Sequence, residues 1–409
     1  MKTLTLVHLR RIRLPKAAAA FVPGSPKSGA GRVVAKLAAR RTKFFAPSSV
    51  APLAGREPVR GVPEICPAAK LAARRHWLGA LLLASVSFLL APLLRAQASA
   101  PADVPDTRYL FSYFIDEKDG LHLAWSGDGL KWQAFLDGGR EKIFLKPAVG
   151  EDKLMRDPCI LFGPDKVFRL VWTDSWHDQT IGFAFSKDLL HWSEQQALPV
   201  MKHEPTARNT WAPEVHYDPA GKQYLIFWSS TIPGRFPETE HTAEDDLNHR
   251  IYLTTTTDFA TYTPTALFFD PKFCAIDATL VPFHNKFYMI FKNETLKPEP
   301  AKNLYLASSD SMAGPYTNIT GPIPTQPTHW LEGPTAIEIN GKVILYYDCY
   351  QDGHFGVCES SDMRTWTDIT PRLSLPKGIR HGTVIAVPAS VITSLITALA
   401  NPAPPPAEL

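Results

Sequence analysis

The chain has 409 residues, of which 45% are hydrophobic, 20% are charged and 11% are aromatic, and its net charge is +3. This composition is typical of a globular protein and excludes a collagen-like or fully disordered chain. The 37 prolines, together with long stretches rich in Tyr, Phe and Thr, favour many short strands over long helices, so we expect an all-β fold.

The small net charge combines two parts of opposite sign. Residues 1–70 contain 14 Lys and Arg but only two acidic residues, and residues 71–98 add three Arg. From Ser99 onward, 38 acidic residues outnumber 26 basic ones. Proteins that bind nucleic acids need a surplus of Lys and Arg on the binding face. The acidic body therefore argues against a nucleic-acid partner.

Residues 71–98 have the features of a secretory signal peptide. Arg74 and Arg75 precede an apolar run that ends in the small-residue site Ala96-Gln97-Ala98. We expect cleavage after Ala98, a secreted or periplasmic protein and no stable membrane insertion afterwards. An uncleaved anchor is the alternative, because about 18 apolar residues can just span a bilayer, but Pro92 and the small-residue site favour cleavage. We interpret residues 1–70 as a basic disordered extension or as the result of a mis-assigned start codon.

Four cysteines lie in the part that would be exported. The spacing of Cys159, Cys274, Cys349 and Cys358 contains no C-x-x-C pair, which argues against a structural zinc site. Cys349 and Cys358 could bridge two strands of one hairpin, and buried free thiols are the equal alternative.

One pattern repeats five times along the chain: Ser or Thr, any residue, Asp, and then an aromatic residue. The copies are Ser126-Gly-Asp128 with Trp132, Ser186-Lys-Asp188 with Trp192, Thr256-Thr-Asp258 with Tyr262, Ser308-Ser-Asp310 with Tyr316, and Ser360-Ser-Asp362 with Trp366. Successive Asp positions are 60, 70, 52 and 52 residues apart, which suits four-stranded propeller blades. Each copy predicts a strand, a turn with an Asp cap, and the next strand.

Two further strands are expected upstream of four copies, but only one upstream of the first copy. The chain has a spare strand at its end, from His381 to Val387. If this strand becomes the innermost strand of the first blade, the ring closes and two open edges disappear. We therefore predict a five-bladed β-propeller within residues 99–390, closed by the C-terminal inner strand, followed by a tail at 391–409.

Acidic residues stand at or near the start of four predicted inner strands. They are Asp157, Glu214, Asp277 and Glu332, and His381 opens the fifth strand. The starts of inner strands meet at one end of the propeller axis. Gathering several carboxylates there is costly unless they share protons or lie beside cations. Such a cluster is a candidate acid/base site.

The ordered set Asp157-Pro, Trp211-Ala-Pro-Glu214, Ile276-Asp277-Ala, Glu332-Gly-Pro and His381-Gly resembles the signature of glycoside hydrolase family 43. These enzymes are five-bladed propellers that act on glycans containing arabinose and xylose. The resemblance implies that Asp157 is the general base, Glu332 the general acid and Asp277 the acid that orients Glu332. It also implies that His381 helps to hold a hydrated structural Ca²⁺ on the axis, with no cofactor required for the reaction. Ala278 and Glu214 depart from the commonest family pattern.

Glycoside cleavage by this set is expected to invert the anomeric centre. An inverting enzyme places its two carboxyl groups about 6.5–9.5 Å apart, so that a water fits between base and sugar. Inner strands one and four face each other across a five-bladed ring and can provide this gap. We expect an ionised Asp277 to keep Glu332 protonated through like-charge repulsion.

Sugar binding needs aromatic platforms and polar groups around a small pocket. The candidates lie in or beside the loops at the same end of the axis: Arg156, Trp176, Arg208, Asn209, Trp211, Glu214, Trp330 and Arg380. Packing between blades is an equal alternative for each Trp, and an ordinary ion pair is an equal alternative for each Arg.

The leading hypothesis is an exported, monomeric glycosidase that removes terminal sugars from plant-type oligo- or polysaccharides. An α-L-arabinofuranosidase is the first choice and a β-xylosidase the next. The long insertion between Thr231 and Arg250 should wall one side of the pocket and favours exo action. Fructan-cleaving relatives are disfavoured because no Asn-Asp-Pro motif precedes Arg156. A non-catalytic lectin-like propeller would not need Asp157, Asp277 and Glu332 together.

Overall fold

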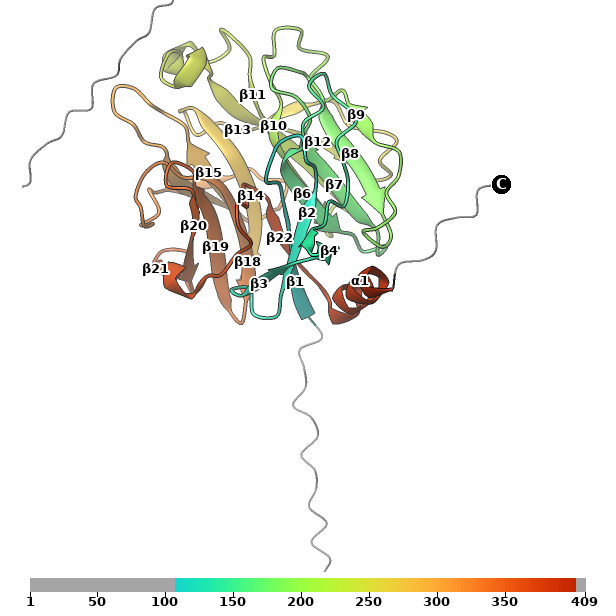
Figure 1. Cartoon of the computed structure of the whole chain (residues 1–409). Helices are drawn as coiled ribbons and strands as arrows, with labels where there is room; N and C mark the ends of the chain where they lie inside the picture. Colours follow the sequence, from blue (N-terminus) through green and yellow to red (C-terminus); the bar gives the residue numbers. More distant parts are fainter. Residues whose placement is uncertain (1–106, 402–409) are drawn as a thin grey trace, which may run out of the picture. The chain divides into compact units, whose positions relative to one another are not determined.

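The computed structural model describes residues 107–401, which form five four-stranded antiparallel sheets and a short hairpin. The expectations for residues 1–70 and for the signal peptide at 71–98 lie outside the described residues. Figure 1 shows the sheets arranged around one axis, with β22, β6, β10, β14 and β18 innermost. The predicted five-bladed β-propeller is confirmed.

The blades are numbered in chain order from the first described strand. Blade 1 contains β22 (Thr383–Pro388), β1 (Thr107–Tyr113), β2 (His122–Ser126) and β3 (Trp132–Ala134). Blade 2 contains β6 (Arg156–Phe162), β7 (Phe168–Thr173), β8 (Ile181–Ser186) and β9 (Gln196–Leu198). Blade 3 contains β10 (Trp211–Asp218), β11 (Gln223–Thr231), β12 (His249–Thr256) and β13 (Ala266–Phe269).

The last two blades follow the same plan. Blade 4 contains β14 (Ala275–Phe283), β15 (Lys286–Asn293), β16 (Asn303–Ser309) and β17 (Thr317–Thr320). Blade 5 contains β18 (Glu332–Ile339), β19 (Lys342–Cys349), β20 (His354–Ser360) and β21 (Thr367–Asp368). The remaining elements are the hairpin β4 (Leu136–Asp137) and β5 (Arg140–Glu141), the 3₁₀ turns η1 (Pro237–Thr239), η2 (Glu244–Asp246) and η3 (Thr370–Arg372), and the helix α1 (Ala389–Ala400).

The C-terminal strand closes the ring in the predicted way. β22 pairs antiparallel with β1, with Ser112 opposite Thr383 and Thr107 opposite Pro388. Blade 1 therefore combines strands from both ends of the described chain, and its inner edge is paired. Closure depends on a pairing between residues more than 270 positions apart.

The repeated Asp caps a turn in four of the five copies. In the first, the backbone N–H groups of Leu130 and Lys131 donate to Asp128 Oδ1, both at 2.8 Å. The copies at Asp188, Asp258 and Asp362 have the same pair of bonds. The copy at Asp310 differs, because this carboxylate pairs with Lys286 instead.

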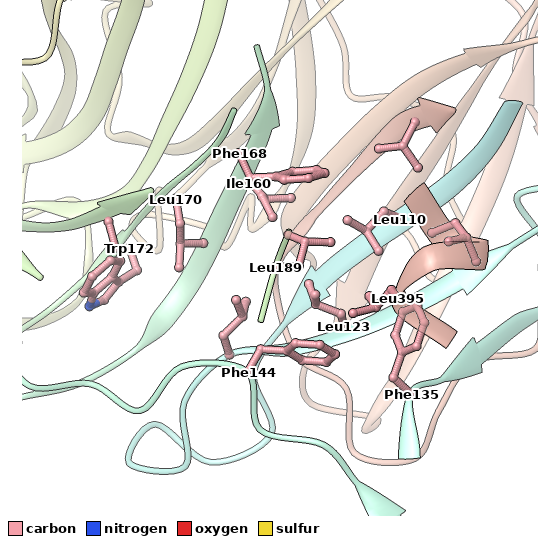
Figure 2. Packing of buried hydrophobic residues seen from close by; sticks show 14 of the residues in the cluster. Leu110, Leu123, Phe135, Phe144, Ile160, Phe168, Leu170, Trp172, Leu189 and Leu395 are labelled. Atoms are coloured by element: carbon pink, nitrogen blue, oxygen red, sulfur yellow. The ribbon is translucent and has the colours of Figure 1, made fainter. Parts of the chain in front are cut away.

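Apolar clusters fill the spaces between neighbouring blades. Figure 2 shows the one between blades 1 and 2, where Leu110 and Leu123 pack near Ile160, Phe168 and Leu170. α1 also contributes Ile392 and Leu395, which are buried in this cluster and lie three residues apart on one face of the helix. The interpretation of residues 391–409 as a tail is therefore corrected for residues 391–400, which belong to a packed helix.

The four cysteines from Cys159 to Cys358 are free and buried. Cys349 lies opposite His354 in the β19–β20 ladder, whereas Cys358 lies opposite Leu345. The two thiols are thus offset along the hairpin. Among residues 107–401, none of the helices has the length and apolar character required to span a bilayer.

Candidate active site

A pocket of about 280 Å³ lies where all five blades meet at one end of the axis. The residues that line it are Arg156, Asp157, Thr173, Trp176, Trp211, Glu244, Asp245, Leu247, His249, Ile276, Asp277, Lys292, Glu294, Glu332 and His381. The three predicted catalytic carboxylates are among them. The structure therefore brings Asp157, Asp277, Glu332 and His381 together.

A β-bulge at the same place in four inner strands directs these side chains. The ladder register shifts just after Arg156, Trp211, Ile276 and Glu332. The next residue in each strand has a positive φ: 52° at Asp157, 46° at Ala212, 54° at Asp277 and 54° at Gly333. Such a φ is costly for residues other than Gly, and it is found where surrounding structure holds a functional side chain in place.

This register corrects the prediction for Glu214. Glu214 lies two residues beyond Ala212, and Ala212 is the residue equivalent to Asp157 and Asp277. The buried carboxylate of Glu214 pairs with His216 at 2.7 Å, and Glu214 does not line the pocket. The sequence alone could not show that position 212, and not position 214, corresponds to Asp157 and Asp277. The correspondence depends on where the bulge lies in the strand.

Asp157 is held in its ionised form by its neighbours. Its Oδ1 is 3.2 Å from His381 Nδ1, and Thr173 Oγ1 donates to its Oδ2 at 2.8 Å. Burial alone would raise the pKa of Asp157, but the charge and hydrogen bond of His381, together with Arg156 and Thr173, outweigh it and lower this pKa to about 2. The same pair raises the pKa of His381 to about 9 despite its burial.

Asp277 has the opposite electrostatic character. Burial raises its pKa to about 6; His381 and Lys292 oppose this rise, whereas Glu332 and Asp157 add to it. The Gly333 N–H donates to Asp277 Oδ2 at 3.0 Å. A Cβ at position 333 would overlap the His381 ring, so only glycine fits between His381 and Asp277. This contact explains the Glu-Gly sequence at the start of β18.

Glu332 lies between two cations. Arg380 Nη2 donates to its Oε1 at 3.1 Å, and Lys292 Nζ lies 3.4 Å from its Oε2. Arg380 also binds Asp348 at 2.8 Å through Nε. The sequence predicted a substrate contact for Arg380, whereas the structure shows it holding the carboxylate of Glu332.

One wall of the pocket is aromatic. Trp176 and Trp211 meet edge to face with centroids 5.7 Å apart, and the His249 ring lies 5.1 Å from Trp211. The Arg156 guanidinium lies 4.5 Å from the Trp176 centroid. Burial lowers the pKa of His249 to about 3, so this ring is neutral at physiological pH. Aromatic faces beside polar groups suit a sugar ring.

Three other predicted binding residues do not line the pocket. Arg208 Nη1 donates to the carbonyls of Asp245 and Asp246 and so holds the insertion between β11 and β12. Asn209 is buried and bonds to the backbone of Thr231. Trp330 packs edge to face on Tyr350. These positions are corrected to structural ones.

The insertion forms a wall of the pocket, as the sequence predicted. Glu244, Asp245 and Leu247, all within residues 232–248, are lining residues. Sequence reasoning missed these individual side chains, and it also missed Thr173, His249, Lys292 and Glu294. For Lys292 the sequence did contain a signal. This lysine ends the apolar strand Phe287–Lys292, and a charged side chain in such a strand needs partners of opposite charge if it is buried.

The residues present do not form a direct coordination sphere for Ca²⁺. His381 Nδ1 faces Asp157, which leaves Nε2 as the ring nitrogen that could face an ion or its water shell. Within residues 107–401, no group of three or more His, Cys, Asp and Glu side chains is arranged to hold a metal.

The fold and the pocket define a five-bladed β-propeller with a carboxylate-based acid/base site. Residues 105–391 match the model of the family described as "Probable glycosyl hydrolase domain", which is related to glycoside hydrolase family 43. The chain belongs to this family.

Individual relatives are distant. An α-L-arabinofuranosidase of Bifidobacterium longum is 24% identical over 280 residues, which are 58% of this chain and 25% of that protein. The chain thus matches a quarter of the length of this curated relative. The solved α-L-arabinofuranosidase of Lactobacillus brevis is 20% identical, with 52% of this chain and 72% of that chain covered and a TM-score of 0.40. An exo-β-1,3-galactanase of Phanerochaete chrysosporium is 14% identical, with 52% and 48% covered and a TM-score of 0.39.

Proposed function

We propose that the protein is an exported, inverting exo-glycosidase that removes terminal α-L-arabinofuranosyl groups from plant-type glycans. One observation carries the proposal: three acids, Asp157, Asp277 and Glu332, line one small pocket, and the pKa values of two of them move in opposite directions, Asp157 to about 2 and Asp277 to about 6. Asp157 is therefore an ionised base, whereas Asp277 holds a proton in mildly acidic solution on the side of the pocket where Glu332 also lies.

In the proposed reaction, the Asp157 carboxylate accepts a proton from water as that water attacks the anomeric carbon. Glu332 gives its proton to the leaving glycosidic oxygen on the opposite face of the sugar. The bond between the anomeric carbon and this oxygen breaks, and the water oxygen replaces it with inverted configuration. Thr173 and His381 orient Asp157, and Asp277 lies beside Glu332 as the second member of the acid pair.

Exo action is supported by the shape of the pocket. It is small, about 280 Å³, and residues 232–248 wall one side of it. A pocket of this kind suits one terminal sugar, whereas an internal unit of a polymer needs an open cleft. The proposed substrate is therefore the end of a glycan chain or a side-chain sugar.

The choice of sugar rests on the Bifidobacterium relative, which is named an α-L-arabinofuranosidase. A β-xylosidase is the second candidate, because a terminal pentose of either ring form meets the same acid pair and aromatic wall. Secretion or periplasmic location is proposed from the signal-peptide features of residues 71–98. A monomer is proposed as the functional state.

The test uses the purified protein with 4-nitrophenyl α-L-arabinofuranoside and 4-nitrophenyl β-D-xylopyranoside. Proton NMR follows the anomer that is released first. We expect faster hydrolysis of the arabinofuranoside, initial release of the inverted sugar, and no activity in Glu332→Gln. Initial release of the retained anomer would overturn the inverting mechanism. A folded wild-type protein that binds arabinan or xylan oligosaccharides without cleaving them would instead support the lectin alternative.

A further inference from the structure

A buried lysine lies behind the Glu332 carboxylate. Lys292 is on β15, the strand next to the inner strand of blade 4, and its side chain is only 3% exposed. Tyr288 and Ile290 share its side of the strand and pack in the apolar cluster between blades 4 and 5. A lysine is rarely buried in such surroundings unless it is paired.

Lys292 has three neighbours that favour its charge. Its Nζ is 2.7 Å from Glu294 Oε2, 3.4 Å from Glu332 Oε2 and 4.7 Å from the centroid of the Tyr350 ring. Burial alone would lower the pKa of Lys292, but Glu294, Glu332 and Asp277 outweigh it and the pKa is raised. Lys292 is therefore a permanent cation at the pocket.

Its partner Glu294 is itself held from the other side. The ammonium of Lys302, a side chain that is 1% exposed, contacts Glu294 Oε1 and lies 3.4 Å from Glu244 Oε1. Glu244 is in the segment 232–248 that walls the pocket. Charges thus alternate in sign from Glu332 through Lys292, Glu294 and Lys302 to this wall. Each buried charge has an opposite neighbour, which is the condition for burying such a series.

The two oxygens of Glu332 are held separately. Arg380 contacts Oε1 and Lys292 contacts Oε2. The titratable or charged groups that act on Glu332 are Lys292, Arg380, Asp277, Asp348, Tyr350 and His381. Arg380 divides its donors between Glu332 and Asp348. Lys292 is therefore the cation that fixes the second oxygen of the carboxyl group.

We propose that Lys292 positions Glu332 for proton transfer and stabilises the carboxylate that forms when the proton leaves. The proposal rests on the function proposed above, in which Glu332 is the general acid, and extends it to a residue outside the three carboxylates. As the proton moves to the leaving oxygen, negative charge grows on Glu332. A preorganised cation beside that charge lowers the barrier because its attraction is stronger in the transition state than in the ground state, where the acid is neutral.

The experiment compares Lys292→Met, Lys292→Arg and the matched control Lys286→Met. Lys286 lies on the same strand but is 47% exposed and pairs with Asp310, outside the pocket. For Lys292→Met we expect kcat to fall about 10- to 100-fold, with KM changed less than about threefold. The alkaline limb of kcat/KM should move to higher pH, because Asp277 loses a neighbouring cation that lowers its pKa. Lys292→Arg should restore part of kcat and move the alkaline limb part of the way back. Lys286→Met should match the wild type.

The Lys292→Met variant is expected to fold, because Arg380 still pairs with Glu332 and Lys302 still pairs with Glu294. Thermal unfolding checks this. A loss of activity explained only by a smaller folded fraction, with an unchanged pH limb, would contradict the positioning role.

An NMR titration, which needs no catalytic turnover, tests the role of Lys292 separately from the proposed function. In protein labelled with ¹³C at the glutamate carboxyl carbons, the signal missing from Glu332→Gln identifies Glu332. We expect its titration midpoint to rise in Lys292→Met and to return toward the wild-type value in Lys292→Arg. An unchanged midpoint in folded Lys292→Met would overturn the proposal even if the enzyme is active. A wild-type protein without glycosidase activity would overturn the proposed function, while the midpoint would still test the effect of Lys292.

Discussion

Asp157 of β6 and Asp277 of β14 occupy the same place in two different blades, yet their pKa values move in opposite directions. Each is the positive-φ residue of a bulge at the start of an inner strand. His381 and Thr173 compensate the burial of Asp157, whose pKa falls to about 2, whereas burial raises that of Asp277 to about 6. The same kind of bulge therefore supplies one ionised group and one that holds a proton in mildly acidic solution.

The pH dependence of kcat/KM should report Asp277. Below about pH 6, Asp277 holds a proton, and above it that proton is lost. We expect kcat/KM to fall as the pH rises through about 6, because the ionised Asp277 repels the negative charge that grows on Glu332 as its proton moves to the leaving oxygen. A pH–rate profile of the wild type beside Asp277→Asn measures this. If the alkaline limb has the same midpoint in Asp277→Asn, Asp277 does not set it.

The Asp157–His381 pair should make stability depend on pH. The pKa of His381 is raised from 6.5 to about 9, so its contribution is complete below about pH 6.5 and is lost as the pH rises through 9. The pKa of Asp157 is lowered from 3.8 to about 2, so its contribution is complete above about pH 4 and is lost as the pH falls through 2. At about 1.4 kcal/mol per pKa unit, the shift of His381 contributes roughly 3 kcal/mol to the free energy of unfolding.

Urea unfolding of the wild type and His381→Asn at pH 5.5 and pH 9.5 tests this linkage. We expect the variant to be less stable by about 2–3 kcal/mol at pH 5.5, with much of this difference gone at pH 9.5. The same difference at both pH values would show that His381 stabilises by packing and not by charge.

Gly333→Ala should destabilise the site more than an ordinary positive-φ glycine substitution. The added Cβ would overlap the His381 ring, whereas Gly341, also at positive φ, has open space around its Cβ position. We expect Gly341→Ala to cost about 1 kcal/mol of unfolding free energy, and Gly333→Ala about 2–4 kcal/mol because overpacking adds to the backbone strain. Chemical denaturation measures both, and equal costs would exclude the overlap as the cause.

Arg208→Met should weaken substrate binding and leave the rate of the chemical step nearly unchanged. Arg208 holds the carbonyls of Asp245 and Asp246 in the wall of the pocket. We expect KM to rise about three- to tenfold with kcat nearly unchanged, because the loss of two hydrogen bonds from a charged donor loosens the wall. Steady-state kinetics decides, with exposed Lys187→Met as a control. A large fall in kcat alone would place Arg208 closer to the reaction than its contacts indicate.

Chelation should leave the reaction intact. In the part of the chain that the structure describes, no group of three or more His, Cys, Asp and Glu side chains is arranged to hold an ion directly. We expect activity and melting temperature to be unchanged, within error, after dialysis against EDTA. A loss that Ca²⁺ restores and Mg²⁺ does not would establish the axial calcium that the family resemblance implies.

Local patterns in the sequence determined the number of blades. Each Asp cap at Asp128, Asp188, Asp258 and Asp362 acts on backbone groups two or three residues away, so its spacing can be read directly from the chain. The unpaired strand after His381 predicted closure, and the acids in Gly/Pro surroundings predicted the pocket. The family resemblance placed Asp157, Asp277 and Glu332 in it.

Tertiary structure decided which neighbouring side chains share that pocket. The bulge after Trp211 moves Glu214 away from it, the insertion turns Arg208 into a support for the wall, and β15 brings Lys292 against Glu332. These relationships depend on ladder register and on contacts between blades, which join residues far apart in the chain. Turn chemistry acts over a few residues and is visible in the sequence, whereas the pairing of buried charges across blades exists only once the ring has closed.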